Sequence, residues 1–399
     1  MEVNMTMTES PLKYLMQLSA SDLRYLMKWT ACNTTDLDSF EDIHLAESPY
    51  HNEILEKLSI SYMHVHGYLS LFVCLCGIPM NIINISVLTR KHMQTPVNCV
   101  LTWIAVSDLL TMASYIIFAM HFYCLNPPDV ISAKKNSYGW MQYLLFHVNF
   151  TATTHTIAIW LGVALAIFRY NHIQSPAKGN LTRMRRLIRA RITVFVIYLG
   201  SMLLLIPNYL SNEIVAKEEN STIFIMKDPK LASQSVSKIM FLNIILYGVV
   251  AKLLPCVLMI IYGSLLLRTL NSKFRTKRLQ LLRKRTYLQR PMDTSRTTIM
   301  LLIVLVLFLL TELPQSILVL LSLFLKGFFE NIYIPLGDTM DILALVNNGI
   351  NFILYCTMSR EFRKGLRKLL CSRCVRPRRE RTQIDSTRPV TYSTIVDSK

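Results

Sequence analysis

Long apolar segments alternate with short polar ones along most of the chain. Seven of these segments reach the length of about 20 residues that a helix needs to cross a bilayer core of about 30 Å. They cover roughly residues 62–88, 97–122, 140–169, 191–210, 238–267, 297–325 and 335–358. The second and third segments carry the most polar interruptions. The pattern predicts an all-α fold, a bundle of seven transmembrane helices.

The seventh apolar segment ends in an informative junction. Asn351 and Tyr355 are four residues apart, so they share a helix face that points toward a packed interior. In the short piece that follows, Phe362 lies opposite basic residues, a pattern that suits a helix on the membrane surface. We therefore predict an extracellular segment 1–61, a bundle 62–358, an interfacial helix 359–374 and a disordered cytosolic tail 375–399.

Composition and charge support a membrane protein. The chain is 52% hydrophobic and 17% charged, against about 25% charged in a soluble domain. Its start lacks the basic and apolar regions of a cleaved signal peptide, so we expect the first span to direct insertion.

The basic residues are unevenly distributed between the loops. They follow the first, third, fifth and seventh segments, while the first 60 residues are acidic. The positive-inside rule then predicts an extracellular N-terminus and a multi-pass protein of the plasma membrane. Juxtamembrane charge accounts for the net charge of +18, so we expect no nucleic-acid partner.

Cysteines and sequons suggest modifications outside the bilayer. Cys32 and Cys124 are the two cysteines on the predicted extracellular side, and a disulfide between them would close a long loop. Cys371 and Cys374, after the interfacial helix, are candidates for palmitoylation. The sequons on predicted extracellular segments, and thus the expected glycosylation sites, are Asn4, Asn33 and Asn220.

Polar residues within the spans are candidates for function, because inserting a charged side chain costs about 2.5–3.5 kcal/mol. Asp108 lies in the middle of the second span, and Asn81, Asn347 and Asn351 lie in the first and seventh. Together they predict a buried polar cluster. It is either a switch that rearranges on activation or a satisfied packing network.

Several motifs resemble those of rhodopsin-like receptors. Arg169-Tyr170 follows the third span with Phe168 in place of the usual acid, and Pro255 and Pro314 stand in spans five and six. The segments 155–161, 308–314 and 351–363 resemble the insect myosuppressin receptors, and the related sex peptide receptors share much of the pattern. The resemblance covers about residues 62–370.

This resemblance implies coupling to a heterotrimeric G protein, of the inhibitory class. Arg169, Tyr170 and Tyr355 would meet the G protein, and Phe308 and Pro314 would belong to the moving part of span six. The cluster near Asp108 would hold water or a sodium ion; we expect no other cofactor and no metal site. Peptide binding would favour a state in which span six swings outward. Serines and threonines in the tail suggest receptor kinases and arrestin as further partners.

The chain also departs from the pattern of the superfamily at positions that concern the ligand. Leu144 stands where a bridging cysteine is usual and residues 209–238 contain no cysteine, so the second extracellular loop is held noncovalently or Cys32–Cys124 substitutes. Thr151 stands where amine receptors carry Asp, which argues against an amine. Glu312 stands where Trp is usual, and it either pairs internally or meets a cationic ligand group.

Peptides ending in Arg-Phe-amide are the ligands that the resemblance implies. Such a ligand needs a carboxylate for its Arg, an apolar pocket for its Phe and hydrogen-bond partners for its amide. His155 is either a ligand contact or a packed core residue, and Trp160 fits a core role better. The candidate ligand-binding residues are Glu312, Asp338, Asp341, His121, Tyr123, Asn149, His155 and Gln315, with Phe122 beside them.

Three other classes are alternatives to a peptide receptor. The chain has no HExxH spacing and no phosphate-cradling glycine loop, which argues against an enzyme. It shows no inverted repeat, which argues against a transporter or channel. An orphan or constitutively active receptor of the same fold remains open, because Phe168 removes one inactivating contact.

Overall fold

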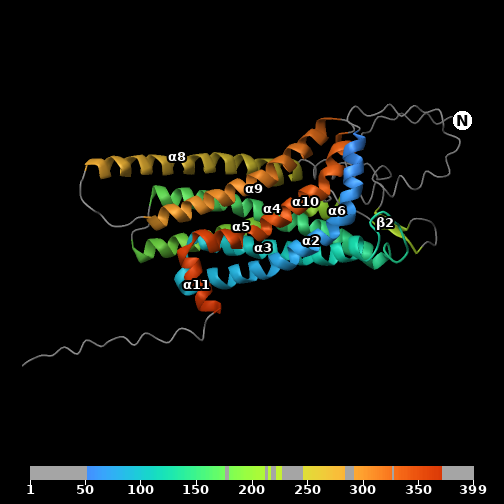
Figure 1. Cartoon of the computed structure of the whole chain (residues 1–399), viewed down its shortest axis with the longest axis horizontal. Coiled ribbons are helices and arrows are strands. Elements are labelled where there is room, and N and C mark those ends of the chain that lie inside the picture. Colours follow the sequence, from blue (N-terminus) through green and yellow to red (C-terminus); the bar gives the residue numbers. More distant parts are fainter. Residues whose placement is uncertain are drawn as a thin grey trace, which may run out of the picture.

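A computed structural model describes residues 52–175, 179–211, 214–216, 222–226, 246–283, 292–325 and 328–370. Seven of its helical segments are long and apolar enough to cross a membrane, which confirms the predicted seven-helix bundle (Figure 1). They are α2 (Glu53–Leu88), α3 (Pro96–Ala119) with η4 (Met120–Cys124), α4 (Tyr138–Gln174), α5 (Asn180–Leu204) with α6 (Ile206–Ser211), η6 (Leu246–Leu253) with α8 (Leu254–Arg283), α9 (Met292–Phe324), and η7 (Phe329–Tyr333) with α10 (Ile334–Met358).

The shorter elements mark the two ends of the bundle. A two-stranded antiparallel hairpin, β1 (Ile214–Ala216) and β2 (Phe224–Met226), lies at one end, which we call the hairpin end. The helix α11 (Arg360–Leu370) and the short η3 (Lys91–Met93) lie at the other, the α11 end. The chain thus separates its predicted extracellular and cytosolic features along the long axis of the molecule (Figure 1).

Several helices extend beyond the apolar segments that predicted them. The helix α2 begins at Glu53, so the expected boundary between residues 61 and 62 falls inside it. The Asn52 side chain starts it by accepting hydrogen bonds from the amides of Ile54 and Leu55 at 3.1 and 3.2 Å. Hydropathy marks only the part of a helix inside the bilayer, because capping and helix propensity continue it into water. Residues 238–245 of the predicted fifth span lie outside the described residues.

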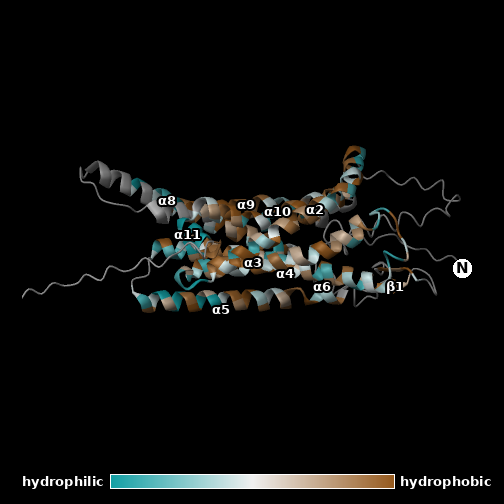
Figure 2. Ribbon diagram, turned by 60° about the horizontal axis from the view of Figure 1, so that its bottom comes forward, coloured by the Kyte–Doolittle hydropathy of each residue, from teal (hydrophilic) through white to brown (hydrophobic). Residues whose placement is uncertain are grey.

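The apolar surface is arranged as a membrane protein requires. Hydrophobic residues run through the middle of the bundle and hydrophilic residues gather toward its ends (Figure 2). Large apolar side chains on α5 face outward, for example Phe195 at 67% exposed and Leu203 at 56%. In water such a surface would be unfavourable, whereas lipid tails accept it. The chain is therefore a multi-pass membrane protein.

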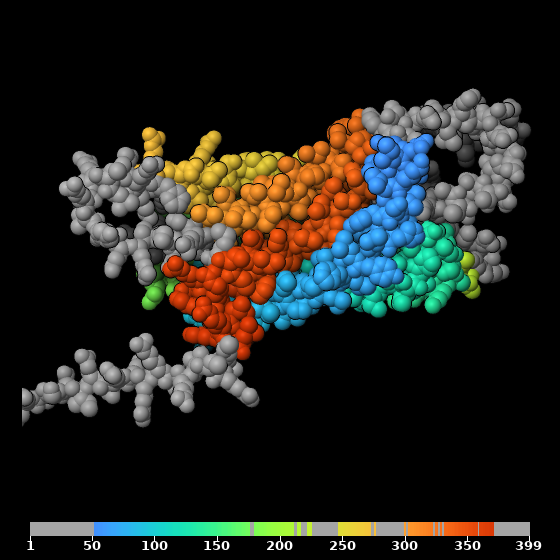
Figure 3. All heavy atoms as spheres, viewed as in Figure 1, coloured from blue at the N-terminus to red at the C-terminus, as the bar shows by residue number. Residues whose placement is uncertain are grey.

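Glycines allow close packing of α2 against its neighbours. The helix runs along α10 on the face shown in Figure 3. A Cβ added to Gly77 would lie 2.5 Å from Met112 Cε of α3, and one added to Gly67 would overlap Tyr123 of η4. Small residues at these positions let the helix backbones approach, as is usual between transmembrane helices.

The hairpin is held to the bundle without a disulfide in the described residues. The amide of Phe224 donates to the carbonyl of Asn136 at 2.9 Å, and the rings of Phe224 and Tyr138 meet edge to face. Leu144, buried at 1% exposed, belongs to the apolar cluster against which Ile214 and Phe224 pack. Of the two alternatives for this loop, the described residues thus show noncovalent attachment.

The loop between η4 and α4 forms a folded base for that hairpin. Lys135 is fully buried, and its ammonium donates to the carbonyls of Pro127 at 2.6 Å and Val130 at 3.2 Å. Cys124 is a free, partly buried thiol, and its predicted partner Cys32 lies outside the described residues. The described part of the chain therefore gives the predicted disulfide no support.

The interfacial helix forms as expected. Phe362 of α11 is buried and its ring packs against Tyr355, with centroids 5.5 Å apart. Arg363 donates to the carbonyls of Cys356 at 3.0 Å and Thr357 at 2.7 Å, which satisfies the end of α10. The helix is described to Leu370. The other calls outside the described residues, which stay predictions, are Asn4, Asn33, Asn220, Cys371, Cys374 and the tail 375–399.

Candidate ligand and coupling sites

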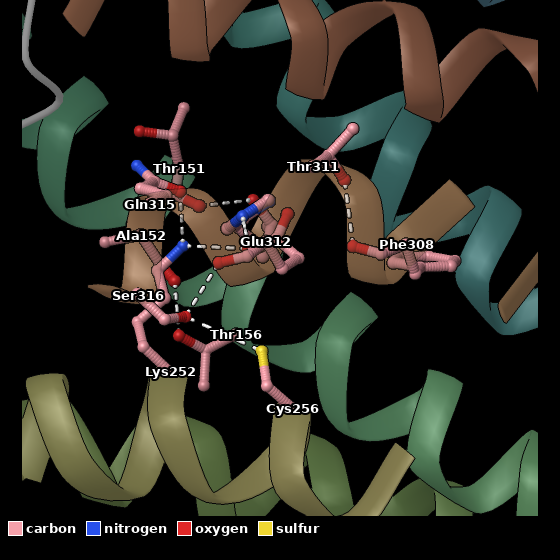
Figure 4. Close-up of polar contacts among 12 residues, drawn as sticks. Thr151, Ala152, Thr156, Lys252, Cys256, Phe308, Thr311, Glu312, Gln315 and Ser316 are labelled. Atoms are coloured by element: carbon pink, nitrogen blue, oxygen red, sulfur yellow. Dashed lines mark hydrogen bonds and ion pairs between the residues drawn. The ribbon is translucent and has the colours of Figure 1, made fainter. Parts of the chain in front are cut away.

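A buried charged group links three helices in the half of the bundle nearer the hairpin. Glu312 of α9 and Lys252 of η6 are each 1% exposed, and their Oε2 and Nζ atoms lie 3.2 Å apart. Figure 4 shows the two side chains pointing toward one another. His155 of α4 brings its Nε2 to 3.0 Å from the same carboxylate oxygen. We call these three residues the charged triad.

Prolines and polar neighbours shape the backbone around the triad. Pro314 removes an amide donor from α9 two residues after Glu312, as Pro255 does in α8 three residues after Lys252. Ser316 donates its hydroxyl to the Glu312 carbonyl at 2.7 Å, and Gln315 accepts from the Lys252 ammonium at 2.9 Å (Figure 4). Lys252 thus lies in a π-helical segment, and Glu312 lies within one turn of a helix-interrupting proline.

The triad answers the question that the sequence left open about Glu312. The carboxylate pairs internally, and its negative charge is balanced by Lys252 inside the protein. Lys252 was not among the predicted site residues, although a lysine within an apolar span is itself a functional signal. One acceptor remains, because Glu312 Oε1 has no hydrogen-bond partner among the described residues.

Two other acids lie nearer the hairpin end, each beside a tyrosine. Tyr123 donates to Asp338 Oδ1 over 3.4 Å, and Tyr115 donates to Asp341 Oδ2 over 3.5 Å. His66 Nε2 lies 2.9 Å from the Tyr115 hydroxyl and is fully buried. The structure therefore brings together Tyr123, Asp338 and Asp341, all predicted from sequence, and adds Tyr115 and His66, which were not.

Two predicted ligand residues have packing roles in the structure. The His121 ring stacks on Trp140, with centroids 3.5 Å apart, and its Nε2 lies 3.2 Å from the Lys135 carbonyl. Asn149 is 1% exposed and accepts from the side-chain amide of Asn208 at 2.7 Å. The polar atoms of His121 bind the loop between η4 and α4, and those of Asn149 bind α6. Neither side chain contacts Asp338 or the charged triad in the described hydrogen bonds. Both were predicted as ligand contacts from their positions in the sequence. Such positions do not show what a side chain contacts.

The polar cluster of α2, α3 and α10 forms as predicted. Asn351 donates to Asp108 Oδ2 over 3.4 Å, and Asn81 donates to the Asn348 carbonyl at 3.0 Å. Asn347 is also buried. Asn84, one turn from Asn81, is fully buried and was not predicted. We call Asn81, Asn84, Asp108 and Asn351 the polar cluster.

This cluster has three acceptors and one donor without partners among the described residues. Asp108 Oδ1, Asn81 Oδ1 and both side-chain polar atoms of Asn84 have no hydrogen-bond partner among the described residues. Oxygen donors of this kind fit a hard cation or water. Among those residues, no group of three or more His, Cys, Asp or Glu side chains could hold a metal ion.

A large cavity opens at the α11 end. It measures about 900 Å³ and is lined by Phe168 and Arg169 of α4, Arg183 and Arg186 of α5, and Arg360 of α11, among others. Arg169 is 5% exposed. Tyr170 faces the ring of Tyr262 in α8, with centroids 6.2 Å apart. Phe308 and Tyr355 are buried in the apolar cluster beside this cavity.

Seven membrane helices, an interfacial helix and a cavity beside Arg169 define a receptor of the G protein-coupled class. Residues 68–373 match the family described as the serpentine type 7TM GPCR chemoreceptor Srw, and the chain belongs to this family. It is thus a receptor and not an enzyme, and a heterotrimeric G protein is its partner.

Individual proteins support the same assignment. The chain is 29% identical to the G-protein coupled receptor dmsr-1 of Caenorhabditis elegans, over 88% of this chain and 76% of that protein. It is 26% identical to the sex peptide receptor of Drosophila melanogaster, over 78% and 73%. It is 25% identical to the thyrotropin-releasing hormone receptor of Gallus gallus, over 79% and 80%. The expected relation to the rhodopsin-like and sex peptide receptors is confirmed.

Proposed function

We propose that this chain is a plasma-membrane receptor for amidated neuropeptides of the Arg-Phe-amide type and signals through inhibitory G proteins. Its similarity to receptors named for sex peptide and thyrotropin-releasing hormone supports a peptide ligand. The observation that carries the proposal is the separation of two kinds of acid. Asp338 and Asp341 lie beside tyrosines near the hairpin end, and Glu312 forms an ion pair with Lys252 deeper in the bundle.

The ligand's Arg suits Asp338 and Asp341. A guanidinium pairs strongly with carboxylates and can use two acceptors at once. Tyr123 and Tyr115 hold these carboxylates through long hydrogen bonds of 3.4 and 3.5 Å, which a stronger charged donor can replace. Glu312, the deepest of the predicted anions, is less suited because Lys252 and His155 already share its Oε2.

The ligand's terminal amide suits the charged triad. Glu312 Oε1 offers one acceptor in a group whose Lys and Glu charges cancel, so a neutral N–H donor fits better than a second cation. A free C-terminal carboxylate would bring a negative charge toward Glu312 and is therefore disfavoured. Glu312 is 1% exposed, so ligand entry requires the helices around it to move apart. Gln315 and His155 flank the same position.

Signalling then follows as a shift between two states. Ligand at the triad biases α8 against α9 at Pro314, and the movement reaches Phe308, Tyr355 and Arg169 at the α11 end. A sodium ion or water at Asp108 stabilises the resting state. The α11 end is cytosolic, the N-terminus is extracellular, and receptor kinases and arrestin act on the tail.

The test is cAMP inhibition in transfected cells by Arg-Phe-amide peptides, their free acids and analogues with neutral citrulline in place of Arg. We expect potency for the amides, little for the acids, and loss of the response with pertussis toxin. Asp341→Asn should weaken the Arg peptide at least about tenfold, because it removes the partner of a buried charge. The citrulline peptide should have the same potency on Asp341→Asn as on the parent receptor.

The control is Asp129→Asn, which removes an exposed acid from the loop at the same end. It should leave all potencies unchanged. Silence to every amide, with surface expression confirmed, would reject the Arg-Phe-amide ligand but not the receptor class. A response that survives pertussis toxin would reject the inhibitory coupling.

A constitutively active receptor is the second candidate. The observation that favours it is Phe168, which stands beside the buried Arg169 where related motifs carry an acid. Such a receptor would lower cAMP in proportion to its expression with no peptide added. Restoring the acid with Phe168→Asp should suppress that basal signal.

A further inference from the structure

His66 of α2 is a fully buried histidine that has no role in the function proposed above. Its ring packs against Tyr62 of its own helix, Tyr115 of α3 and Tyr123 of η4, with centroids 5.7, 6.2 and 5.2 Å away. Buried polar atoms are kept in proteins where they have hydrogen-bond partners. The contacts of this imidazole therefore indicate what it does in the bundle.

The hydroxyl of Tyr115 lies between two partners. It donates to Asp341 Oδ2 over 3.5 Å, and His66 Nε2 lies 2.9 Å away on the other side. The first distance is longer than the usual O–H···O range of about 2.5–3.0 Å, whereas the second is of ordinary length. Tyr115 is 4% exposed. The hydroxyl is therefore held closely by the histidine of α2 and only loosely by the acid of α10.

The short contact does not depend on which nitrogen of His66 carries the proton. A protonated Nε2 donates to the Tyr115 oxygen, and an unprotonated Nε2 accepts from the Tyr115 hydroxyl. In either form Tyr115 keeps a partner when Asp341 turns to another donor. A buried hydroxyl left with no partner is costly. The histidine therefore lowers the cost of freeing the Asp341 carboxylate from Tyr115.

Close packing of α2 fixes the position of this imidazole. The next residue is Gly67, where an added Cβ would overlap Tyr123 of η4. One turn further on, the buried Ser70 hydroxyl lies 3.3 Å from the same Nε2 atom of His66. The histidine thus acts on Tyr115 from a place that the backbone of α2 sets.

We propose that His66 is a positioning residue for recognition of the ligand's cation. It keeps the Tyr115 hydroxyl hydrogen-bonded while the guanidinium of the ligand takes Asp341. It thereby favours a cationic group over a neutral group of the same shape, although His66 itself does not touch the ligand. This role rests on the proposed function, which pairs the ligand's Arg with Asp341. A ring that served only for packing would leave the preference for a cation unchanged.

The first test compares an Arg-Phe-amide peptide with its citrulline analogue on the full-length receptor, by inhibition of cAMP. His66→Phe keeps an aromatic ring and loses both nitrogens. We expect the potency of the Arg peptide to fall about fivefold, because ligand binding then leaves a buried hydroxyl without a partner. The potency of the citrulline peptide should not change. His66→Gln supplies an amide that can donate or accept, and it should restore most of the preference.

Two further variants serve as controls. His64→Phe makes the same replacement at an exposed position of the same helix, and it should leave both potencies unchanged. Tyr115→Phe removes the hydroxyl on which His66 acts. Adding His66→Phe to Tyr115→Phe should therefore cause no further loss of potency for the Arg peptide. Surface expression of each variant establishes that it is folded.

Thermal melting of the purified receptor tests the contact between His66 and Tyr115 without any peptide. His66→Phe and Tyr115→Phe should each lower the melting temperature. The double variant should lose less than the sum of the two, because both changes remove the same hydrogen bond. Additive losses would overturn the proposal, whatever the peptides do.

Three results in cells would also overturn it. They are equal losses of the Arg and citrulline peptides in His66→Phe, no recovery in His66→Gln, and a further loss when His66→Phe is added to Tyr115→Phe. A parent receptor that is silent to every amide would reject the proposed function, and the cation role of His66 with it. The melting result is obtained without ligand, so it shows separately whether His66 holds Tyr115.

Discussion

Two buried carboxylates in this bundle have opposite surroundings. Glu312 lies 3.2 Å from the Lys252 ammonium and 3.0 Å from the His155 ring. Asp108 contacts only the Asn351 amide among the hydrogen bonds of the described residues, at 3.4 Å, and its Oδ1 has none. Both residues are about 1% exposed.

The difference shows how one fold uses the same chemical group in two ways. The chain itself balances the charge of Glu312, so this carboxylate links helices, and under the proposed function it is also a neutral floor for the ligand. Asp108 Oδ1 has no hydrogen-bond partner among the described residues, so we expect this carboxylate to respond to water, protons or small cations in its surroundings. Removing a partner of Glu312 should therefore destabilise the receptor. Removing the charge of Asp108 should stabilise it.

Lys252→Met gives the largest expected effect. It leaves Glu312 with only His155 in a buried site, and an uncompensated buried charge costs about 3–5 kcal/mol. The unfolding temperature of the purified receptor and its surface expression should both fall sharply.

The companion variant joins Lys252→Met to Glu312→Gln. Without either charge the site is neutral again, so the double variant should recover most of the lost stability. A double variant no more stable than Lys252→Met would show that the pair does not interact as the 3.2 Å contact implies.

His155→Leu should have the next largest effect. It removes one hydrogen bond to the carboxylate and keeps Lys252, and hydrogen bonds to charged groups contribute about 1.5–3 kcal/mol. Thermal melting measures the loss, with Thr151→Val, which alters a hydroxyl bonded to its own helix, as the control. A loss as large as that of Lys252→Met would make His155 the main partner of Glu312.

Asp108→Asn should act in the opposite direction. It removes a buried carboxylate that has one long hydrogen bond, so the receptor should gain about 1–3 kcal/mol in sodium-free buffer. Stability measured against sodium concentration should rise for the parent receptor and stay level for the variant. If the stability of the parent receptor does not change with sodium concentration, the proposal of a sodium ion at this site is rejected.

Asn84→Val should give the smallest change. Both polar atoms of Asn84 lack partners among the described residues, so an apolar side chain of similar size should stabilise the receptor by about 1 kcal/mol. Asn81→Val serves as the contrast, because Asn81 donates to the Asn348 carbonyl and its removal should destabilise. Loss of stability in Asn84→Val would show that ordered water occupies the cluster.

The sequence predicted the parts of this molecule that depend on local pattern. Hydropathy located seven spans, and the alternation of Phe362 with basic residues located α11. Helix ends were missed where capping extends a helix beyond the apolar segment, as Asn52 does for α2. Such ends depend on a few hydrogen bonds and leave no trace in hydropathy.

Most residues of the candidate site were predictable from sequence, Tyr123, His155 and Gln315 among them, but their contacts were not. Glu312, Asp338 and Asp341 stood out as charges in or near apolar spans, but the pairing of Glu312 with Lys252 joins residues 60 positions apart. No spacing rule connects them, since the contact depends on how η6 and α9 pack. His121 and Asn149 show the converse, because polar residues at a promising depth can be used entirely by the fold.

The noncovalent attachment of the hairpin has a practical consequence for how this protein is made and handled. Between Leu144 and the hairpin there is no sulfur bond for a reductant to cut, and the hairpin is fastened by a backbone hydrogen bond and ring packing. This closure can therefore form as soon as the helices assemble, without an oxidant or an isomerase. Dithiothreitol should accordingly leave the docking of this hairpin intact.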